Sequence, residues 1–199
     1  MHATLPQKVR AVRRVYARLD ADIERMQQAS RLHCLSGCGE CCKKPDIEAT
    51  PVEFLPLALD YFDRGEAEFV HEQLGESSTT CFVFRPHLTS FGGLCNAYPD
   101  RGLIFRLFGF TARVNRLNQP ELVTCKFIKS EQAKEFESWN AQMASGASVP
   151  IMTNYYSRMA SIDPSLNTMM PINHAMRKAL EVVMHYYAYR KRRKPRTSS

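Results

Sequence analysis

The residues of this chain best suited to chemistry are its seven cysteines, four of which fall within the stretch Cys34-Leu-Ser-Gly-Cys38-Gly-Glu-Cys41-Cys42. Thiols gathered this densely add little to a hydrophobic core. As thiolates they can converge on one borderline or soft metal ion, or on an iron–sulfur cluster. Gly37 and Gly39 allow the backbone to turn tightly, so that successive sulfur atoms can point inward. The density and spacing therefore predict a metal or cluster site.

The remaining cysteines are spread over the following part of the chain, and we expect one metal centre per chain, containing zinc or iron, with [4Fe–4S] as one form. The candidate ligands are Cys34, Cys38, Cys41, Cys42, Cys81, Cys95 and Cys125. Cys34 is expected at the end of a helix, and the side chains of Cys41 and Cys42 are expected to diverge, leaving one of them beside the ligand set. The odd number of cysteines argues against a disulfide framework.

Composition favours a soluble protein of a reducing compartment. The first thirty residues carry too many charges for the apolar region of a signal peptide, and no apolar run approaches the ~20 residues of a membrane span. Seven cysteines without an export signal fit a compartment where thiols stay free to bind metal. We therefore expect a cytoplasmic location.

The net charge of +7 belongs to the two ends of the chain, because residues 1–31 carry +4, residues 190–199 carry +6 and the body carries −3. This distribution argues against a basic surface that tracks nucleic acid. The basic tail is typical of a solvated segment, with an acidic partner or nucleic acid as the alternative.

The first helix is predicted from an unbroken alternation of four- and three-residue steps. Its apolar stripe consists of Leu5, Val9, Val12, Tyr16, Leu19, Ile23 and Met26, and the helix is expected to end near His33. The stripe would either pack on its own domain or form the seam of a homodimer or another protein contact.

The rest of the chain predicts a mainly α fold, with helices around a small irregular cysteine-rich centre that includes a possible short β-hairpin. Thr50-Pro51-Val52-Glu53 is a capping box that begins one helix, and Ser130 is the expected N-cap of another over 131–144. Further helices are expected over 66–74, 101–110, 150–162 and 172–189, a hairpin between 81–85 and 94–98, and strands at 112–114 and 122–127, the last carrying Cys125. The expected organisation is an N-terminal amphipathic helix (1–32), a metal-binding domain (33–128), further helices of that domain (129–189) and a basic tail (190–199).

One known family has a similar pattern. Cys34-x3-Cys38-x2-Cys41-Cys42, followed by Cys81-Phe-Val-Phe, Cys95-Asn-Ala-Tyr98-Pro-Asp-Arg101, Arg106-Leu-Phe and Cys125, resembles the YkgJ-type cysteine-cluster family. That family is described as a zinc- or iron-chelating domain with a C-x2-C-x2-C-C motif. The resemblance covers roughly residues 33–128, and it implies a metal site built from these cysteines.

The chain departs from the family pattern at two positions. Gly102 stands where the family has proline, and Phe105 stands where it has a cysteine. With one thiol fewer, the sulfurs suffice for one four-coordinate centre but not for two, unless His33 or His87 joins. Arg101 and Arg106 lie between cysteines in sequence, where a guanidinium could offset thiolate charge and donate hydrogen bonds to sulfur.

Three enzymatic alternatives compete with plain metal binding. The spacing Cys34-x3-Cys38-x2-Cys41 is also that of radical S-adenosylmethionine enzymes, but a helix rather than a strand precedes Cys34 here. Flagellin lysine methylases carry a similar cluster, which makes a protein-lysine methylase-like iron–sulfur enzyme a second alternative. A nucleophilic cysteine needs a partnered base, and His33 beside Cys34 is adjacent only in sequence. The sequence thus indicates a metal-binding protein and leaves an enzymatic role open.

Overall fold

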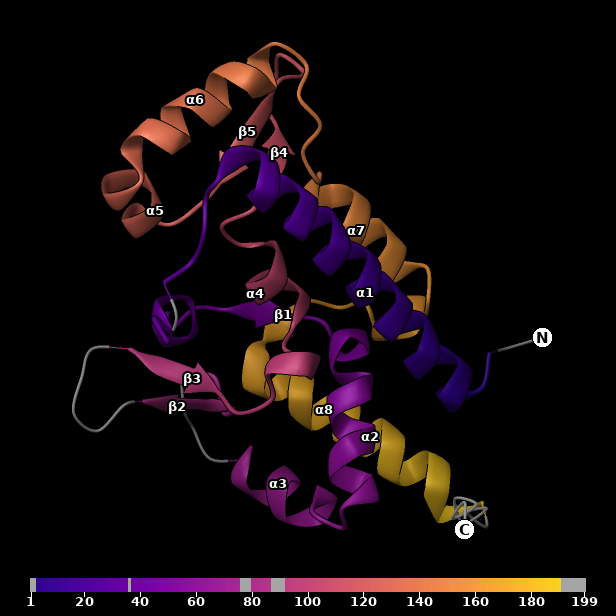
Figure 1. The fold of residues 1–199 in the computed structure, drawn as a ribbon. Helices are drawn as coiled ribbons and strands as arrows, with labels where there is room; N and C mark the ends of the chain where they lie inside the picture. Colours follow the sequence, from indigo (N-terminus) through magenta and orange to yellow (C-terminus); the bar gives the residue numbers. More distant parts are fainter. Residues whose placement is uncertain (1–2, 36, 76–79, 87–91, 191–199) are drawn as a thin grey trace, which may run out of the picture.

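The computed structural model describes residues 3–35, 37–75, 80–86 and 92–190, and this part of the chain is mainly helical, as predicted (Figure 1). Its helices are α1 (Leu5–Ser30), α2 (Leu55–Asp63), α3 (Ala67–Gln73), α4 (Leu103–Leu107), α5 (Lys126–Glu131), α6 (Ala133–Ala144), α7 (Met152–Ala160) and α8 (Ile172–Ala188). Short 3-10 helices occur at Glu40–Lys43, Pro51–Phe54, Tyr98–Asp100 and Pro164–Leu166.

The strands form three antiparallel pairs and no larger sheet within the described residues. The pairs are β1 (Glu48–Ala49) with β6 (Met170–Pro171), β2 (Phe84–Pro86) with β3 (Gly93–Cys95), and β4 (Thr111–Val114) with β5 (Pro120–Val123). In the β2–β3 hairpin, Phe84 lies opposite Cys95. This is the small hairpin that the sequence predicted beside the cysteines.

Helix α1 buries its whole apolar stripe against its own chain, which is the first of the two arrangements that the sequence allowed. All seven stripe residues are buried: Leu5, Val9, Val12, Tyr16, Leu19, Ile23 and Met26. The surfaces that cover the stripe come from α2, α4, α6 and α7. Burial of this area already stabilises the monomer, so the stripe offers no free apolar face to a second copy.

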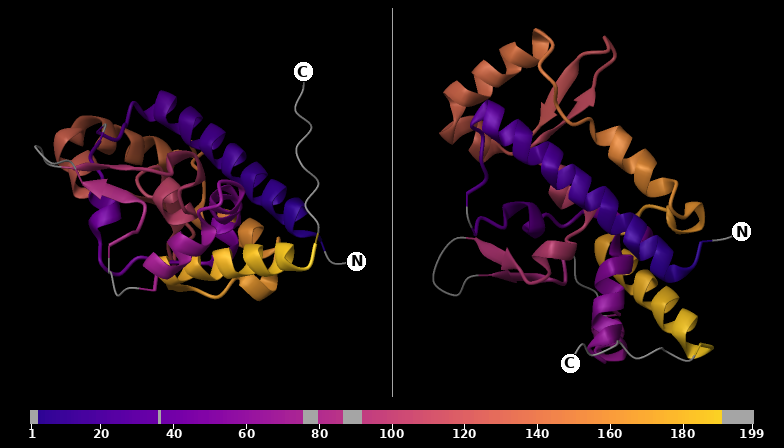
Figure 2. Two further views of the ribbon diagram at one scale, coloured as in Figure 1. Left: turned by 90° about the horizontal axis from the view of Figure 1, so that it is seen from below. Right: turned by 45° about the vertical axis from the view of Figure 1, so that its right-hand side comes forward.

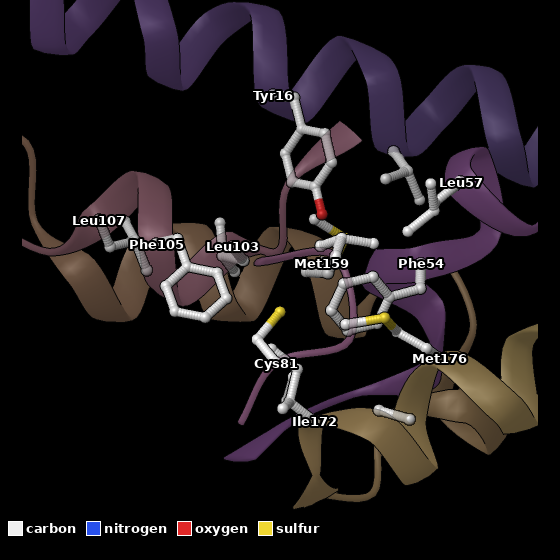
Figure 3. Close-up of a cluster of buried hydrophobic side chains, with 14 of the residues drawn as sticks. Tyr16, Phe54, Leu57, Cys81, Leu103, Phe105, Leu107, Met159, Ile172 and Met176 are labelled. Carbon is white, nitrogen blue, oxygen red and sulfur yellow. The ribbon is translucent and has the colours of Figure 1, made fainter. Parts of the chain in front are cut away.

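The core lies between the two longest helices. Figure 2 shows α1 and α8 on opposite sides of the shorter elements, and α2 packs against both. In the close-up of Figure 3, Tyr16 reaches from α1 toward Met159, and Phe54 lies beside Met176. These side chains belong to one continuous cluster of buried apolar residues, so the helices fold as one packed unit.

Three local expectations were wrong. Helix α1 ends at Ser30 rather than near His33, since Arg31 adopts a left-handed conformation with φ 62°. Strand β5 ends at Val123, and Cys125 is the N-cap of α5 instead of a strand residue. Ser130 lies within α5 and is not an N-cap, because Gln132 breaks the predicted helix before α6 begins.

The buried carboxylate of Glu53 joins three helices. Its Oε1 accepts hydrogen bonds from the Thr50 amide (2.9 Å) and hydroxyl (2.8 Å), which forms the predicted capping box. Its Oε2 accepts from the Leu103 amide at the start of α4 (2.7 Å), and its backbone carbonyl accepts from the Tyr16 hydroxyl of α1 (2.8 Å). Glu53 is 1% exposed, and burial raises its pKa although these amide and hydroxyl donors lower it.

Within the described residues, none of the helices combines the length and the apolar character needed to cross a membrane.

Replacing Glu53 with alanine should destabilise the fold strongly. The substitution leaves two amides and a hydroxyl buried without an acceptor, so we expect the free energy of unfolding to fall by about 3 kcal/mol. Urea unfolding followed by circular dichroism measures the change. Glu24→Ala, at an exposed site on α1, is the matched control and should stay within about 0.5 kcal/mol of the parent. Equal losses in the two variants would show that the Glu53 network does not stabilise the fold.

Candidate metal centre

All seven cysteines line one cavity of about 430 Å³. They arrive from separate parts of the chain: the segment after α1, the 3-10 helix at Glu40–Lys43, the approach to β2, strand β3 and the N-cap of α5. The first four cysteines lie on the cysteine segment, residues 34–35 and 37–42. Figure 1 shows this segment between the β2–β3 hairpin and the C-terminal end of α1. The fold therefore gathers every candidate ligand that the sequence predicted around one space.

Glycines allow the cysteine loop and the hairpin to pack directly backbone to backbone. The Gly93 amide donates to the Gly37 carbonyl at 2.8 Å. Gly39 has φ +60°, and a Cβ there would lie 2.6 Å from the Phe84 ring. A Cβ on Gly92, which has φ +113°, would lie 2.2 Å from the Gly37 carbonyl oxygen. Only glycine fits these positions, so the loop that presents Cys38 is fixed against the strand that presents Cys95.

The thiols differ in exposure. Cys34 is exposed, Cys42 and Cys81 are buried, and Cys38, Cys41, Cys95 and Cys125 are half-buried; all seven are free. In Figure 3, Cys81 lies between Phe105 and Phe54, so the floor of the cavity is continuous with the apolar core. Burial raises the pKa of Cys81 to about 12, which keeps this thiol protonated until a cation binds it.

Cys41 and Cys42 both line the cavity, and whether one of them lies outside the ligand set stays a prediction. Both belong to the same 3-10 turn. A hydrogen bond from the Cys42 thiol lowers the pKa of Cys41, and the same bond, with burial, raises the pKa of Cys42. Cys41 is therefore the more readily ionised member of the pair, and the one better prepared to bind a cation.

Arg101 is the cationic side chain of the cavity wall. Its guanidinium lies 4.2 Å from the centre of the Tyr98 ring, and its buried Nε has no hydrogen-bond partner within the described residues. Burial raises the pKa values of Cys34 and Cys95, and the charge of Arg101 opposes this rise. Arg101 thus stands where the sequence predicted a guanidinium that offsets thiolate charge.

Arg106 does not line the cavity, but its charge, like that of Arg101, opposes the rise in the pKa of Cys95. Its guanidinium is buried, forms an ion pair with Asp20 of α1 and donates to the backbone carbonyls of Pro99 and Arg101. It also stacks over the Tyr16 ring at 4.2 Å. Arg106 therefore ties the segment that carries Arg101 to α1.

A glutamine that the sequence analysis did not single out holds the entry to the cysteine segment. The Gln132 side chain accepts a hydrogen bond from the His33 amide (2.9 Å) and donates to the His33 carbonyl (2.7 Å). The two residues are 99 positions apart, so no local pattern could have revealed the pair. His33 lines the cavity, while His87, the other histidine considered, lies outside the described residues.

The two departures from the family pattern both have a structural counterpart. Phe105, which replaces a cysteine, is buried and forms an apolar part of the cavity wall. Gly102, which replaces a proline, lies against Phe54, and a Cβ there would approach the Phe54 ring to 2.8 Å. Close packing at Phe54 thus favours glycine at this position.

Seven thiols suit a metal that prefers sulfur ligands. However, the sulfur atoms line a cavity and do not converge on one position. Thiolates suit zinc, copper(I) and iron–sulfur clusters. Within the described residues, no three side chains of His, Cys, Asp or Glu stand close enough together to form a finished metal site. Binding of a single ion would therefore require the thiols to move inward.

The comparisons with known proteins agree with this chemistry. The model of the CxxCxxCC family, described as "Putative zinc- or iron-chelating domain", matches residues 33–141. The match covers more than half of the chain and extends from the cysteine segment into α6. No curated protein and no solved structure matches the chain.

Thiol alkylation should depend on both exposure and ionisation. When reduced native protein is treated with iodoacetamide at pH 8 and digested for mass spectrometry, we expect the exposed Cys34 and the readily ionised Cys41 to react first. Cys42 and Cys81 should react at least tenfold more slowly, because burial limits access and raises their thiol pKa values. The same reaction in urea is the control and should remove the difference. Native labelling of Cys81 as fast as that of Cys34 would contradict the placement of Cys81 in the core.

Proposed function

Because the chain belongs to the CxxCxxCC family of zinc- or iron-chelating domains, we propose that it binds one metal centre through thiolates of the seven-cysteine cavity. The observation that carries this proposal is the shared cavity, since cysteines separated by up to 91 positions line the same space. In this proposal residues 33–128 hold the centre, residues 1–32 and 129–189 support it, and residues 190–199 form a basic tail.

The ligands come from Cys38, Cys41, Cys42, Cys81, Cys95 and Cys125, with Cys34 contributing least because it is exposed. Cys125 lines the cavity, and its Sγ is held in place by a hydrogen bond that it accepts from the Ile128 amide (3.5 Å) at the start of α5. Arg101 offsets part of the negative charge that several thiolates bring together. A bound metal would supply a cation that holds these sulfurs near one another.

Between zinc and iron, the shape of the cavity favours an iron–sulfur cluster. Tetrahedral zinc holds its sulfurs at about 2.3 Å from the ion, which requires four thiolates to converge closely on one point. Here the cysteines surround a space of about 430 Å³, which suits a cluster of several atoms bound at its corners by cysteines. The same volume lies within the range of small-molecule sites, which is the observation that favours the alternative of an iron–sulfur enzyme.

The main candidate remains a metal-binding protein of the cytoplasm. Seven free cysteines are compatible with a reducing compartment and support this location. The basic tail after α8 suits an acidic partner better than the body of the chain does, because the body carries a net negative charge.

The metal can be identified from protein purified without oxygen. We expect a brown sample with broad absorption near ~400 nm and iron and sulfide in comparable amounts per chain. Cys41→Ser and Cys81→Ser should lower the metal content by more than half, whereas Cys34→Ser, the exposed comparison, should retain most of it. A colourless protein with one zinc per chain would show that the site binds zinc and not an iron–sulfur cluster. Metal-free protein with an intact fold would overturn metal binding itself.

Removal of the metal should loosen the centre and spare the outer helices. Hydrogen exchange at residues 92–127 should accelerate after chelation, because short strands and the five-residue α4 have few local interactions of their own. Exchange in α7 and α8 serves as the internal control and should change little. Unchanged exchange at 92–127 would mean that this region does not depend on the metal.

A further inference from the structure

A second and larger cleft lies on another side of α1. It has a volume of about 620 Å³ and is formed by α1, α6, α7 and the segment 145–151 that joins α6 to α7. Figure 1 shows α6 and α7 flanking the same long helix, with this segment running between them. The cleft shares no lining residue with the cysteine cavity, so the metal centre does not account for it.

The cleft has an excess of positive charge. Arg18, Arg25 and Arg158 line it, and Asp22 is its one acidic lining residue. Arg25 forms an ion pair with Asp22, which also accepts a hydrogen bond from the Tyr155 hydroxyl. Arg18 and Arg158 form no ion pair with any described residue. Two guanidinium groups from different helices therefore remain available at one cleft.

Both arginines line the cleft together with Tyr155. Its pKa is raised by burial and by the hydrogen bond to Asp22, and the charges of both Arg18 and Arg158 oppose that rise. Their charges thus act on the same hydroxyl from α1 and from α7. An anion beside Tyr155 would meet both guanidinium groups at once.

Neutral donors add to the cleft. Asn154 and Ser148 line it and are polar groups that an oxyanion can contact. Trp139, from α6, also lines it; the side chain is 2% exposed, and its indole N–H has no acceptor within the described residues. A buried indole donor without a partner is rare, and such a group calls for an explanation.

We propose that this cleft binds a small molecule carrying a phosphate or carboxylate group, with Arg18 and Arg158 as its principal contacts. Guanidinium groups hold both kinds of oxyanion through paired hydrogen bonds, and the two arginines approach from facing helices. The volume fits a small metabolite, and Asp22 holds Arg25 and Tyr155 in place at the edge of the site.

The chain contains its own reporter for this cleft, because Trp139 is its single tryptophan. The full chain, as purified, is titrated at low ionic strength with inorganic phosphate, pyrophosphate and citrate. Binding is followed by tryptophan fluorescence and by calorimetry. We expect saturable binding of at least one anion. Tighter binding of pyrophosphate than of citrate would indicate a phosphate ligand, and the reverse order would indicate a carboxylate ligand.

Four variants separate a specific site from general attraction by a basic protein. Arg18→Gln and Arg158→Gln should each raise Kd about tenfold or more, the expected effect of losing a hydrogen bond between charged groups. Arg14→Gln removes the same charge from an exposed position of α1 outside the cleft and should leave Kd unchanged. Arg158→Lys retains the charge but loses the planar pair of donors, and it should weaken binding less than Arg158→Gln.

Unfolding midpoints of the variants, measured by circular dichroism, establish that they fold. Absence of saturable binding of all three anions by both methods would overturn the proposal. So would an Arg14→Gln variant that weakens binding as much as Arg18→Gln does. Because the cleft and the cysteine cavity have separate linings, Cys41→Ser should retain anion binding, whatever the metal proves to be.

Discussion

The buried carboxylate of Glu53 is the interaction on which the rest of the structure depends. It closes the N-terminus of one helical segment, accepts the first amide of α4 and, through its own backbone, receives the hydroxyl of Tyr16 from α1. Helix α4 in turn places Phe105 on the cavity wall, and the turn before it places Arg101 there. A carboxyl group at the centre of an apolar core is tolerated because both of its oxygens accept hydrogen bonds. The hydrogen bonds of Glu53 therefore connect the wall of the cysteine cavity to the core.

Much of the fold could be predicted from local patterns, since α1, the capping box at Thr50 and the hairpin beside Cys95 are all encoded by neighbouring residues. The errors lie where short elements meet. Cys125 continues an extended, strand-like stretch in sequence, yet its sulfur caps a helix, because an unpaired amide at α5 needs an acceptor. The pairing of Gln132 with His33 could not be predicted at all, because each residue is ordinary in its own neighbourhood.

The candidate metal site also has one part that could be predicted from the sequence and one that could not. The spacing of the first four cysteines alone predicts a metal site, whereas the 3-10 helix that carries Cys41 and Cys42 was not predicted. Cys81, Cys95 and Cys125 join the first four cysteines because the hairpin and α5 pack against that segment. The spacing of cysteines in the sequence does not determine this packing. Helix α1 then separates the two cavities: Ile23 and Gln27 face the thiols, while Arg18 and Asp22 line the opposite cleft. One helix thus contributes different faces to sites of different chemistry.

The hydrogen-bonded pair of His33 and Gln132 has a consequence for how the chain matures on the ribosome. The first four cysteines emerge early in translation, but the clamp that fixes their segment awaits a residue about two-thirds of the way along the chain. Until then the nascent chain exposes a dense group of nucleophilic thiols in the cell, open to oxidation or to capture of the wrong cation. Synthesis therefore passes through a stage in which these thiols are already present but the contact that fixes their segment has not yet formed.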